Sequence, residues 1–296
     1  MTGIPAPVQD IRQPPGFYRR RVGEMIVTAL HDGNLDLPMA SFVGLLPEDG
    51  EAMFTAAFRP TTPRLSVHCF LVQNADRIVL VDAGGAGSAY PALGDMRANL
   101  RAAGVTPEQV SAVLLTHMHG DHAAGLVDES GRPVFANADL LIHASDIAHW
   151  TNGENEARAP AARRSAFALA RRVLPAYGER VRPFHEGDVS PGISAVHLRG
   201  HTPGHSGFLL RSGAERLLIW GDIVHAPEIQ FARPDVTTAF DVEPAKAAAT
   251  RQRIMASAAM EQMPVAGAHL HFPPFGHVAR AGAAFRFVPE VWSPTP

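Results

Sequence analysis

Short apolar runs separated by polar turns dominate the first half of the chain, a pattern typical of buried strands. Their partly β-branched composition predicts strands at residues 25–30, 66–72, 77–81, 111–115 and 138–143. The second and third of these runs are joined by a short polar turn, so we expect them to pair. A turn is predicted at Asp32-Gly33, whereas residues 38–62 show no regular period and are expected to be irregular.

Helical patterns alternate with further strands in the rest of the chain. Helices are predicted at residues 93–103, 107–109, 144–150, 156–174 and 244–260, and strands at 187–196, 207–210 and 216–220. The strands form two sets, one in each half of the chain, which predicts an α/β fold of two packed sheets flanked by helices. Residues 1–296 are expected to form a single domain, with residues 1–22, rich in Pro and Gln, as an extended N-terminal arm.

Composition narrows the class of protein. The chain is 46% hydrophobic with a formal net charge of −3 and no dense Lys/Arg stripe, which argues against nucleic-acid and membrane-surface partners. Cys69 is the only cysteine, so an intrachain disulfide is excluded. No apolar run reaches about 18 residues, and the first residues lack a signal-peptide pattern. We therefore expect a cytoplasmic protein.

Four potential metal ligands lie within six residues directly after the apolar run 111–115, namely His117, His119, Asp121 and His122. In an extended segment, alternate side chains point the same way, so His117 and His119 can bind one ion together. Gly120 permits a sharp bend, after which Asp121 and His122 face a different point. The sequence therefore predicts a loop that serves two adjacent cations.

Three more candidate ligands, His201, Asp222 and His269, each follow a predicted strand. Each is a weak signal alone, but with the first loop they provide enough ligands for two sites. A set of nitrogen and carboxylate ligands without thiolate favours Zn, Mn, Fe or Co. The glycine-rich run 82–85 lacks the spacing of phosphate-binding loops, so a structural turn is the better interpretation.

The order and spacing of these motifs resemble the metallo-β-lactamase superfamily from about residue 25 to the tail. The closer match is to the methyl parathion hydrolase branch of esterases, lactonases and organophosphate hydrolases. It is carried by the runs 16–18, 30–33, 35–38, 221–225, 267–269, 272–273 and 276–277. Pro274 departs from the glycine expected there, and the export signal of that branch is missing.

This resemblance implies a four-layer αββα sandwich, the metallo-β-lactamase fold, and a homodimer in which the N-terminal arm is a candidate contact. It implies two divalent cations per chain, with zinc as the first choice. One metal would be held by His117, His119 and His201, and the second by Asp121, His122 and His269, with Asp222 bridging both. His205, His225, His271 and His277 are interpreted as orienting or structural residues.

The predicted activity is that of a dinuclear-metal hydrolase in which a metal-bound hydroxide attacks esters or lactones, with methyl parathion-type phosphotriesters as further substrates. Asp121 and Asp222 are the predicted catalytic carboxylates. The candidate lining of an apolar substrate pocket is Trp150, Phe167, Phe54 and Phe240, although each residue equally fits a core position.

Two alternatives stay open. The first is an acyl-homoserine lactone lactonase of the quorum-quenching type, and the second is a metal-binding sensor without hydrolytic activity. A two-zinc β-lactamase with a cysteine ligand is disfavoured, because Asp222 stands in the bridging place and Cys69 comes too early in the chain. A glyoxalase II-type thioesterase lacks the basic C-terminal stretch, and the acidic balance argues against a tRNA-processing nuclease.

Overall fold

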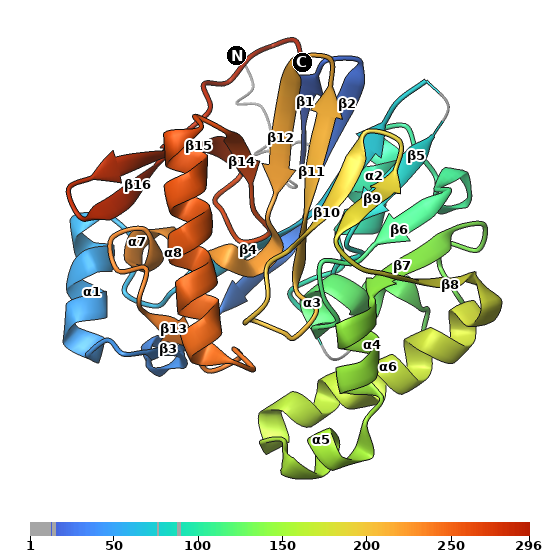
Figure 1. The fold of residues 1–296 in the computed structure, drawn as a ribbon, viewed down its shortest axis with the longest axis horizontal. Coiled ribbons are helices and arrows are strands. Elements are labelled where there is room, and N and C mark those ends of the chain that lie inside the picture. Colours follow the sequence, from blue (N-terminus) through green and yellow to red (C-terminus); the bar gives the residue numbers. More distant parts are fainter. Residues whose placement is uncertain (1–12, 14–15, 76, 88–89) are drawn as a thin grey trace, which may run out of the picture.

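Two seven-stranded sheets packed face to face form the centre of the molecule (Figure 1). The computed structural model describes residue 13 and residues 16–75, 77–87 and 90–296. In spatial order, the first sheet consists of β1 (Phe17–Val22), β2 (Met25–Asp36), β4 (Arg64–Gln73), β5 (Ile78–Val81), β6 (Ala112–Leu114), β7 (Asp139–His143) and β8 (Val181–Phe184). The second consists of β16 (Ala284–Pro289), β15 (Phe275–Ala281), β14 (Pro264–Ala266), β12 (Glu215–Ile219), β11 (Ser206–Ser212), β10 (Ile193–His197) and β9 (Gly187–Ser190).

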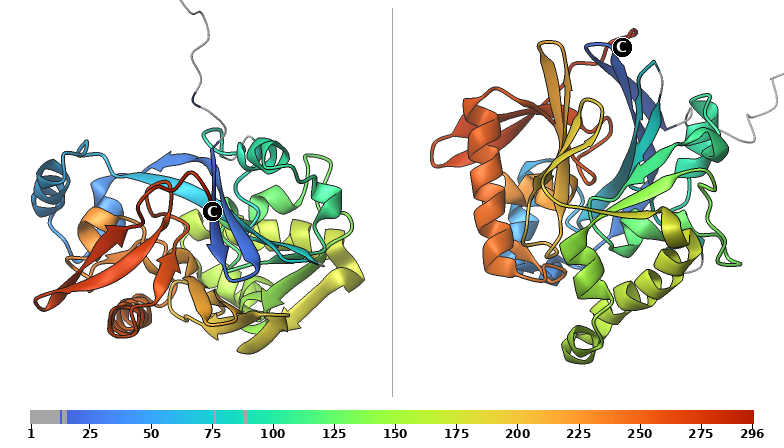
Figure 2. Two further views of the ribbon diagram at one scale, coloured as in Figure 1. Left: turned by 90° about the horizontal axis from the view of Figure 1, so that it is seen from above. Right: turned by 45° about the vertical axis from the view of Figure 1, so that its right-hand side comes forward.

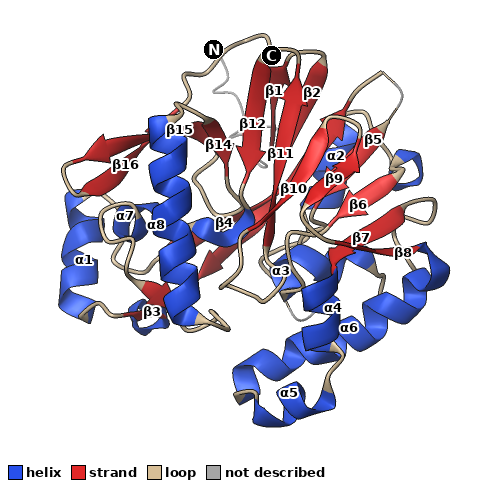
Figure 3. Ribbon diagram, viewed as in Figure 1, coloured by secondary structure: helices blue, strands red, loops and turns tan. Residues whose placement is uncertain are grey.

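Helices cover the outer face of each sheet, and the right-hand view of Figure 2 shows the four layers in turn. The first sheet carries α2 (Met96–Ala102), α3 (Gly120–Ala123), α4 (Ala144–Trp150), α5 (Gly153–Arg158) and α6 (Arg164–Tyr177). The second sheet is covered by α8 (Pro244–Met260). The two short helices α1 (Pro47–Ala56) and α7 (Pro227–Gln230) pack together near the small sheet of β3 (Phe42–Val43) and β13 (Thr237–Thr238) (Figure 3). The predicted αββα sandwich is thus confirmed.

The alternation of side chains along the strands explains the layers. In β5, Val79 and Val81 face the core between the sheets, whereas Leu80 faces the core under the helices, as the period of two requires. A third apolar cluster, which includes Leu218 and Met255, joins the second sheet to α8. Strands buried on both faces need apolar residues at successive positions, which explains the short continuous runs in the sequence.

The topology places several strand ends at one edge of the sandwich. Strands β5, β6, β7 and β8 run parallel, as do β12 and β14 in the other sheet. In sheets of this kind, ligands bind outside the carboxyl ends of the strands. The segments that follow β6, β12 and β14 contain the predicted ligands, so the fold brings them to a common edge.

Some sequence predictions were wrong in detail. Residues 17–22, assigned to the extended arm, form β1, which pairs with β2 along its whole length. Most of the remaining arm, residues 1–12 and 14–15, lies outside the described residues. The turn predicted at Asp32-Gly33 is a bulge inside β2, and the segment expected to be irregular contains α1. Pro47 at its first position and Glu48 and Asp49 in its first turn are helix-start signals that would have revealed it.

The helix predicted over residues 156–174 is divided into α5 and α6, with Pro160 in the connection between them. None of the helices that the structure describes is long and apolar enough to cross a membrane. The assignment of the whole chain to one domain stays a prediction.

Candidate metal centre

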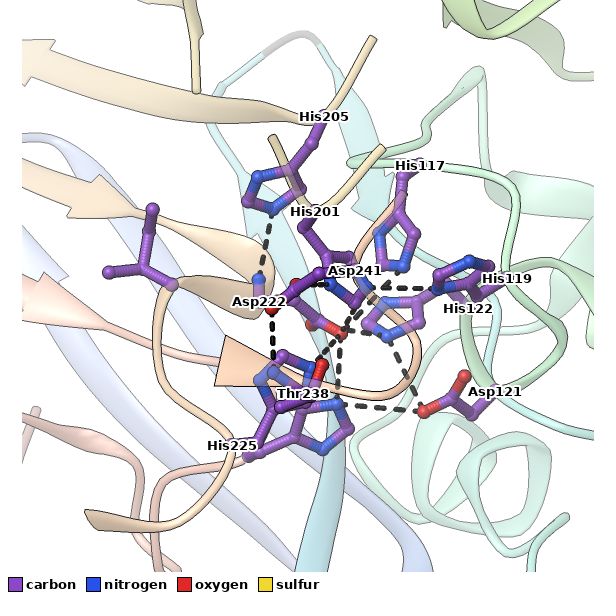
Figure 4. A network of polar contacts seen from close by, with 12 residues as sticks. His117, His119, Asp121, His122, His201, His205, Asp222, His225, Thr238 and Asp241 are labelled. Atoms are coloured by element: carbon purple, nitrogen blue, oxygen red, sulfur yellow. Dashed lines mark hydrogen bonds and ion pairs between the residues drawn. The ribbon is translucent and has the colours of Figure 1, made fainter. Parts of the chain in front are cut away.

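All seven predicted ligands lie together at the shared edge, where Figure 4 shows most of them converging around Asp222. The ligand atoms of His117, His119 and His201 lie within 4.8 Å of one another. The same holds for Asp121, His122 and His269, which form a second group. The two groups correspond to the two ligand sets implied by the family resemblance.

Asp222 occupies the position between these groups. Its Oδ2 lies 3.3 Å from His201 Nε2 and 3.2 Å from His269 Nε2, so one oxygen faces a histidine of each group. Its Oδ1 lies 3.2 Å from His122 Nε2. This arrangement is the one that a bridging carboxylate requires.

Gly221 permits the backbone turn that presents Asp222 at the end of β12. It has a φ of +56°, and a Cβ at this position would lie 2.6 Å from His205 Nε2. His205 is needed there because its Nε2 accepts a hydrogen bond from the Asp222 backbone N–H (3.0 Å), while its Nδ1 donates to Leu198 O. His205 therefore positions Asp222, as predicted for an orienting residue, and the other side of Asp222 is left for the centre.

Buried acceptors fix the orientation of the histidine rings. His201 Nδ1 donates to Asp241 Oδ1 (2.8 Å), and His269 Nδ1 donates to Ser66 O (2.8 Å). His122 Nδ1 donates to Asp82 Oδ2 at the same distance. A ring whose Nδ1–H is engaged in this way presents the lone pair of Nε2 to the centre, which is how metal-binding histidines are held.

Asp82 belongs to the run that was interpreted as a structural turn, and its role in orienting His122 was not foreseen. It adopts a φ of +62°, which is uncommon for a residue other than glycine. Its two carboxylate oxygens also accept hydrogen bonds from the backbone and the hydroxyl of Thr116. The His117 ring then donates from Nδ1 to the Thr116 hydroxyl oxygen (3.1 Å), so one carboxylate orients a histidine of each group.

Asp146, in α4, ties two ligand loops together. Its Oδ1 accepts from Gly204 N (2.7 Å) in the loop of His201, and its Oδ2 accepts from Met118 N (3.1 Å) between His117 and His119. No local motif marks Asp82, Asp146 or Asp241 as special, because their partners lie 28 to 58 residues away in the sequence. Sequence reasoning had no signal for them beyond the residue type.

The polar atoms that face the centre fit a pair of cations. Within the described part of the chain, the buried atoms His117 Nε2, His122 Nε2 and Asp222 Oδ1 have no hydrogen-bond partner. Leaving such atoms unsatisfied is costly, and metal coordination would satisfy them. His119 Nδ1 and His201 Nε2 face each other at 2.9 Å, a pair that a shared cation also accommodates. The set of five imidazoles and two carboxylates suits a borderline divalent metal.

Charges in the centre shift several protonation equilibria. Burial lowers the pKa of His201, but its hydrogen bonds to Asp222 and Asp241 outweigh this effect and raise the pKa to about 9. The pKa of His122 is also raised well above its ordinary value, because the charges of Asp222, Asp121 and Asp82 outweigh the cost of burial. The pKa of Asp222 is held well below its usual range by the surrounding histidines, against the effect of burial. In the metal-free protein, protons thus take the places of positive charge.

The four predicted pocket residues do not lie together. Trp150 is fully buried, with its ring edge on His119 (5.6 Å between centroids), and Phe167 packs on Trp150 (4.9 Å). Phe54 lines a separate cavity of about 480 Å³ that also contacts Ser66, Glu228 and Phe272. Phe240 is half-buried, 6.2 Å from the His225 ring. Their contact with substrate stays a prediction.

The other histidines divide into two classes. His271 Nε2 donates to Glu228 Oε1 (2.6 Å), outside both ligand groups, and His277 is exposed on β15. His225 is different, because its Nε2 lies 3.2 Å from Asp222 Oδ2 and it forms a further group with His201 and Asp222.

The fold and this cluster define a protein with a dinuclear-type ligand set at the edge of an αββα sandwich. The sequence profile of the Metallo-beta-lactamase superfamily matches residues 62–269, and the chain belongs to this family.

Three relatives narrow the comparison. The chain is 27% identical over 169 residues to an N-acyl homoserine lactonase of Bacillus sp, covering 50% of this chain and 59% of that protein. It is 25% identical over 170 residues to the N-acyl homoserine lactonase AiiB of Agrobacterium fabrum (strain C58 / ATCC 33970), covering 50% and 58%. The matched region thus spans less than two thirds of these curated relatives. Among solved structures, the hydrolase AbOPH in beta lactamase superfamily superimposes with a TM-score of 0.90 at 28% identity, covering 95% of this chain and 100% of that one. The dizinc quorum-quenching lactonase AidC, with a TM-score of 0.88 at 23% identity over 94% and 98% of the two chains, supports the fold alone.

Proposed function

We propose that this chain is a dinuclear-metal hydrolase that cleaves lactones or related esters. The observation that carries the proposal is the convergence of seven nitrogen and carboxylate ligands from four distant segments around Asp222. His117, His119 and His201 would hold one cation, and Asp121, His122 and His269 the other. Asp222 would contact both, and zinc is the metal we expect first.

Two cations bound here would supply an activated water and polarise the substrate oxygen. The protein side chains set up this chemistry. Asp121 is 17% exposed at its side chain, against 3% or less for His122, Asp222 and His269, so it marks the accessible side of the centre. The histidine charges outweigh the effect of burial and lower the pKa of Asp121, which keeps it ionised. Asp121 and Asp222 can therefore both accept hydrogen bonds from the attacking water and orient it.

The relatives support a lactone as the substrate class. Those matched by sequence are N-acyl homoserine lactonases. The motif resemblance to the methyl parathion hydrolase branch adds arylesters and phosphotriesters to the substrates worth testing. A homodimer in the cytoplasm completes the proposal, and light scattering after gel filtration tests its oligomeric part.

The test combines metal analysis with turnover. We expect about two zinc ions per chain and hydrolysis of N-hexanoyl homoserine lactone or p-nitrophenyl acetate that is lost on chelation and in His117→Ala. His277→Gln, which changes an exposed histidine outside the site, should match the wild type. Metal-loaded protein that binds both ions but cleaves no lactone, ester or phosphotriester would favour the sensor alternative. Turnover that is unaffected by chelator and by His117→Ala would remove the dinuclear proposal itself.

A further inference from the structure

His225 faces the same centre as the seven predicted ligands but is not one of them. It follows Asp222 by three residues and is 2% exposed. Its ring stacks on His269, with 5.2 Å between centroids and 21° between planes, and lies 4.9 Å from the His201 ring. His225 therefore touches one member of each ligand group, and Figure 4 shows it beside Asp222.

The hydrogen bonds of His225 differ from those of the ligand histidines. His117, His122, His201 and His269 each have a protein acceptor for Nδ1. For His225, neither Nδ1 nor Nε2 has a hydrogen-bond partner anywhere in the described structure. A metal-binding histidine normally donates its second ring nitrogen to an orienting group. By this criterion, His225 is not built as a ligand.

The backbone around His225 is nevertheless held firmly. Gln230 is fully buried, and its Oε1 accepts from His225 N (2.7 Å) while its Nε2 donates to Val236 O (3.1 Å). Arg251, also buried, donates from Nε to Ile223 O (2.6 Å) in the same loop. A side chain held in this way, with a free N–H, has the properties of a preorganised donor.

The neighbouring carboxylate indicates which ring nitrogen carries the proton. Nε2 faces Asp222 Oδ2 at 3.2 Å, and a lone pair on Nε2 would be repelled by that oxygen, so the Nε2–H tautomer is favoured. The donor thus points into the space shared by both ligand groups. That is where a substrate oxygen would come to be polarised.

We propose that His225 is a catalytic residue, whose Nε2–H donates a hydrogen bond to the substrate oxygen that gains negative charge during attack. This inference rests on the hydrolase proposed above. As the water oxygen bonds to the acyl carbon, the π electron pair of the carbonyl moves onto its oxygen, where His225 stabilises it without giving up its proton. The carbonyl then re-forms, the bond to the leaving oxygen breaks, and the alkoxide takes up the proton released by the attacking water. Such donors act on the transition state more than on the bound substrate.

Two variants of equal length separate donation from packing. His225→Gln keeps an N–H donor, whereas His225→Met does not, and His225→Phe keeps the ring that stacks on His269. We expect all three to bind two zinc ions per chain. In His225→Phe and His225→Met, kcat should fall on the order of 100-fold with KM changed far less, and His225→Gln should recover at least about tenfold.

Loss of one zinc from His225→Phe and His225→Met would overturn the proposal, because it would make His225 a ligand. Equal kcat values for the Gln and Met variants would also refute it, and this comparison stands even if the Phe variant fails to fold. A separate readout is the binding of hexanoate, a simple carboxylate, to the zinc-loaded proteins by calorimetry. If the wild type cleaves no substrate, the hydrolase proposal fails by itself. Hexanoate binding about tenfold weaker in the Met variant than in the Gln variant would still support donation by His225, and equal binding would contradict it.

Discussion

Replacing Asp241 by Asn should weaken one metal position and spare the other. Asp241 is fully buried, and its two oxygens accept from His201 Nδ1 (2.8 Å) and from Thr238 N (2.7 Å). An asparagine side chain has nearly the same shape but only one acceptor oxygen. If that oxygen stays on Thr238, the amide NH₂ faces His201 and forces the ring proton from Nδ1 to Nε2. The nitrogen that faces the centre then has no lone pair to offer.

The size of the effect follows from this geometry. Loss of an orienting partner typically costs about 10- to 100-fold in metal affinity, which is about 1.4–2.7 kcal/mol. The loss should be confined to the position of His117, His119 and His201. Asp82→Asn is the matched variant, because Asp82 accepts from His122 Nδ1 in the other group at the same distance of 2.8 Å.

Competitive zinc titration against a chromophoric chelator measures both affinities. We expect Asp241→Asn to lower the affinity of one zinc ion, and metal reconstitution of His201→Ala and His122→Ala backgrounds to show which one. In the His201→Ala background, Asp241→Asn should have little further effect, whereas Asp82→Asn should still weaken the remaining ion. If Asp241→Asn binds both ions like the wild type, the tautomer argument is wrong. Equal weakening of both positions would show that the two groups do not act as separate sites.

Three further predictions concern protons, a buried cation and one glycine. Because the pKa of His201 is raised to about 9 in the metal-free protein, it is protonated at pH 7 and must lose this proton to bind metal, so zinc affinity should rise between pH 7 and 9; calorimetry in buffers of different ionisation enthalpy should detect proton release, and its absence would contradict the shift. Arg251→Met removes donors to Ile223 O, Pro234 O and Val236 O, and should lower the free energy of unfolding by about 3 kcal/mol or more in urea titrations, whereas Arg253→Met, exposed on the same helix, should change it by less than about 0.5 kcal/mol. Gly221→Ala should reduce zinc content and kcat because its Cβ would displace His205, while Gly213→Ala, with a similar φ of +60° and open space around it, should show only a stability loss of about 1 kcal/mol; equal zinc content and kcat in the two variants would refute the steric argument.

The arrangement of the ligand groups was predictable because each ligand directly follows a strand. Periodicity located those strands, and the family resemblance supplied the pairing of distant segments. The same reasoning failed for β1, whose residues Phe17–Val22 include a run of arginines and only one fully buried position, so no apolar run marked it. It also failed for α1, because only Gly50 and Phe54 are buried there and the apolar period is weak.

The residues that orient the ligands were beyond prediction. Asp241 and Asp146 act through contacts between segments far apart in the sequence, and an isolated aspartate before a helix or inside one has many ordinary uses. Asp82 lies in a run whose glycines indicated a turn, and only its contact with His122 shows what the turn is for. The substrate pocket was unpredictable for a similar reason, since an aromatic side chain in a cavity wall and one in the core have the same sequence pattern.

Anomalous diffraction at the zinc absorption edge tests the central claim most directly. In crystals of the zinc-loaded protein, we predict two anomalous peaks per chain, one bounded by His117, His119 and His201 and the other by Asp121, His122 and His269, with Asp222 in contact with both. A single peak, or two peaks away from Asp222, would contradict the account.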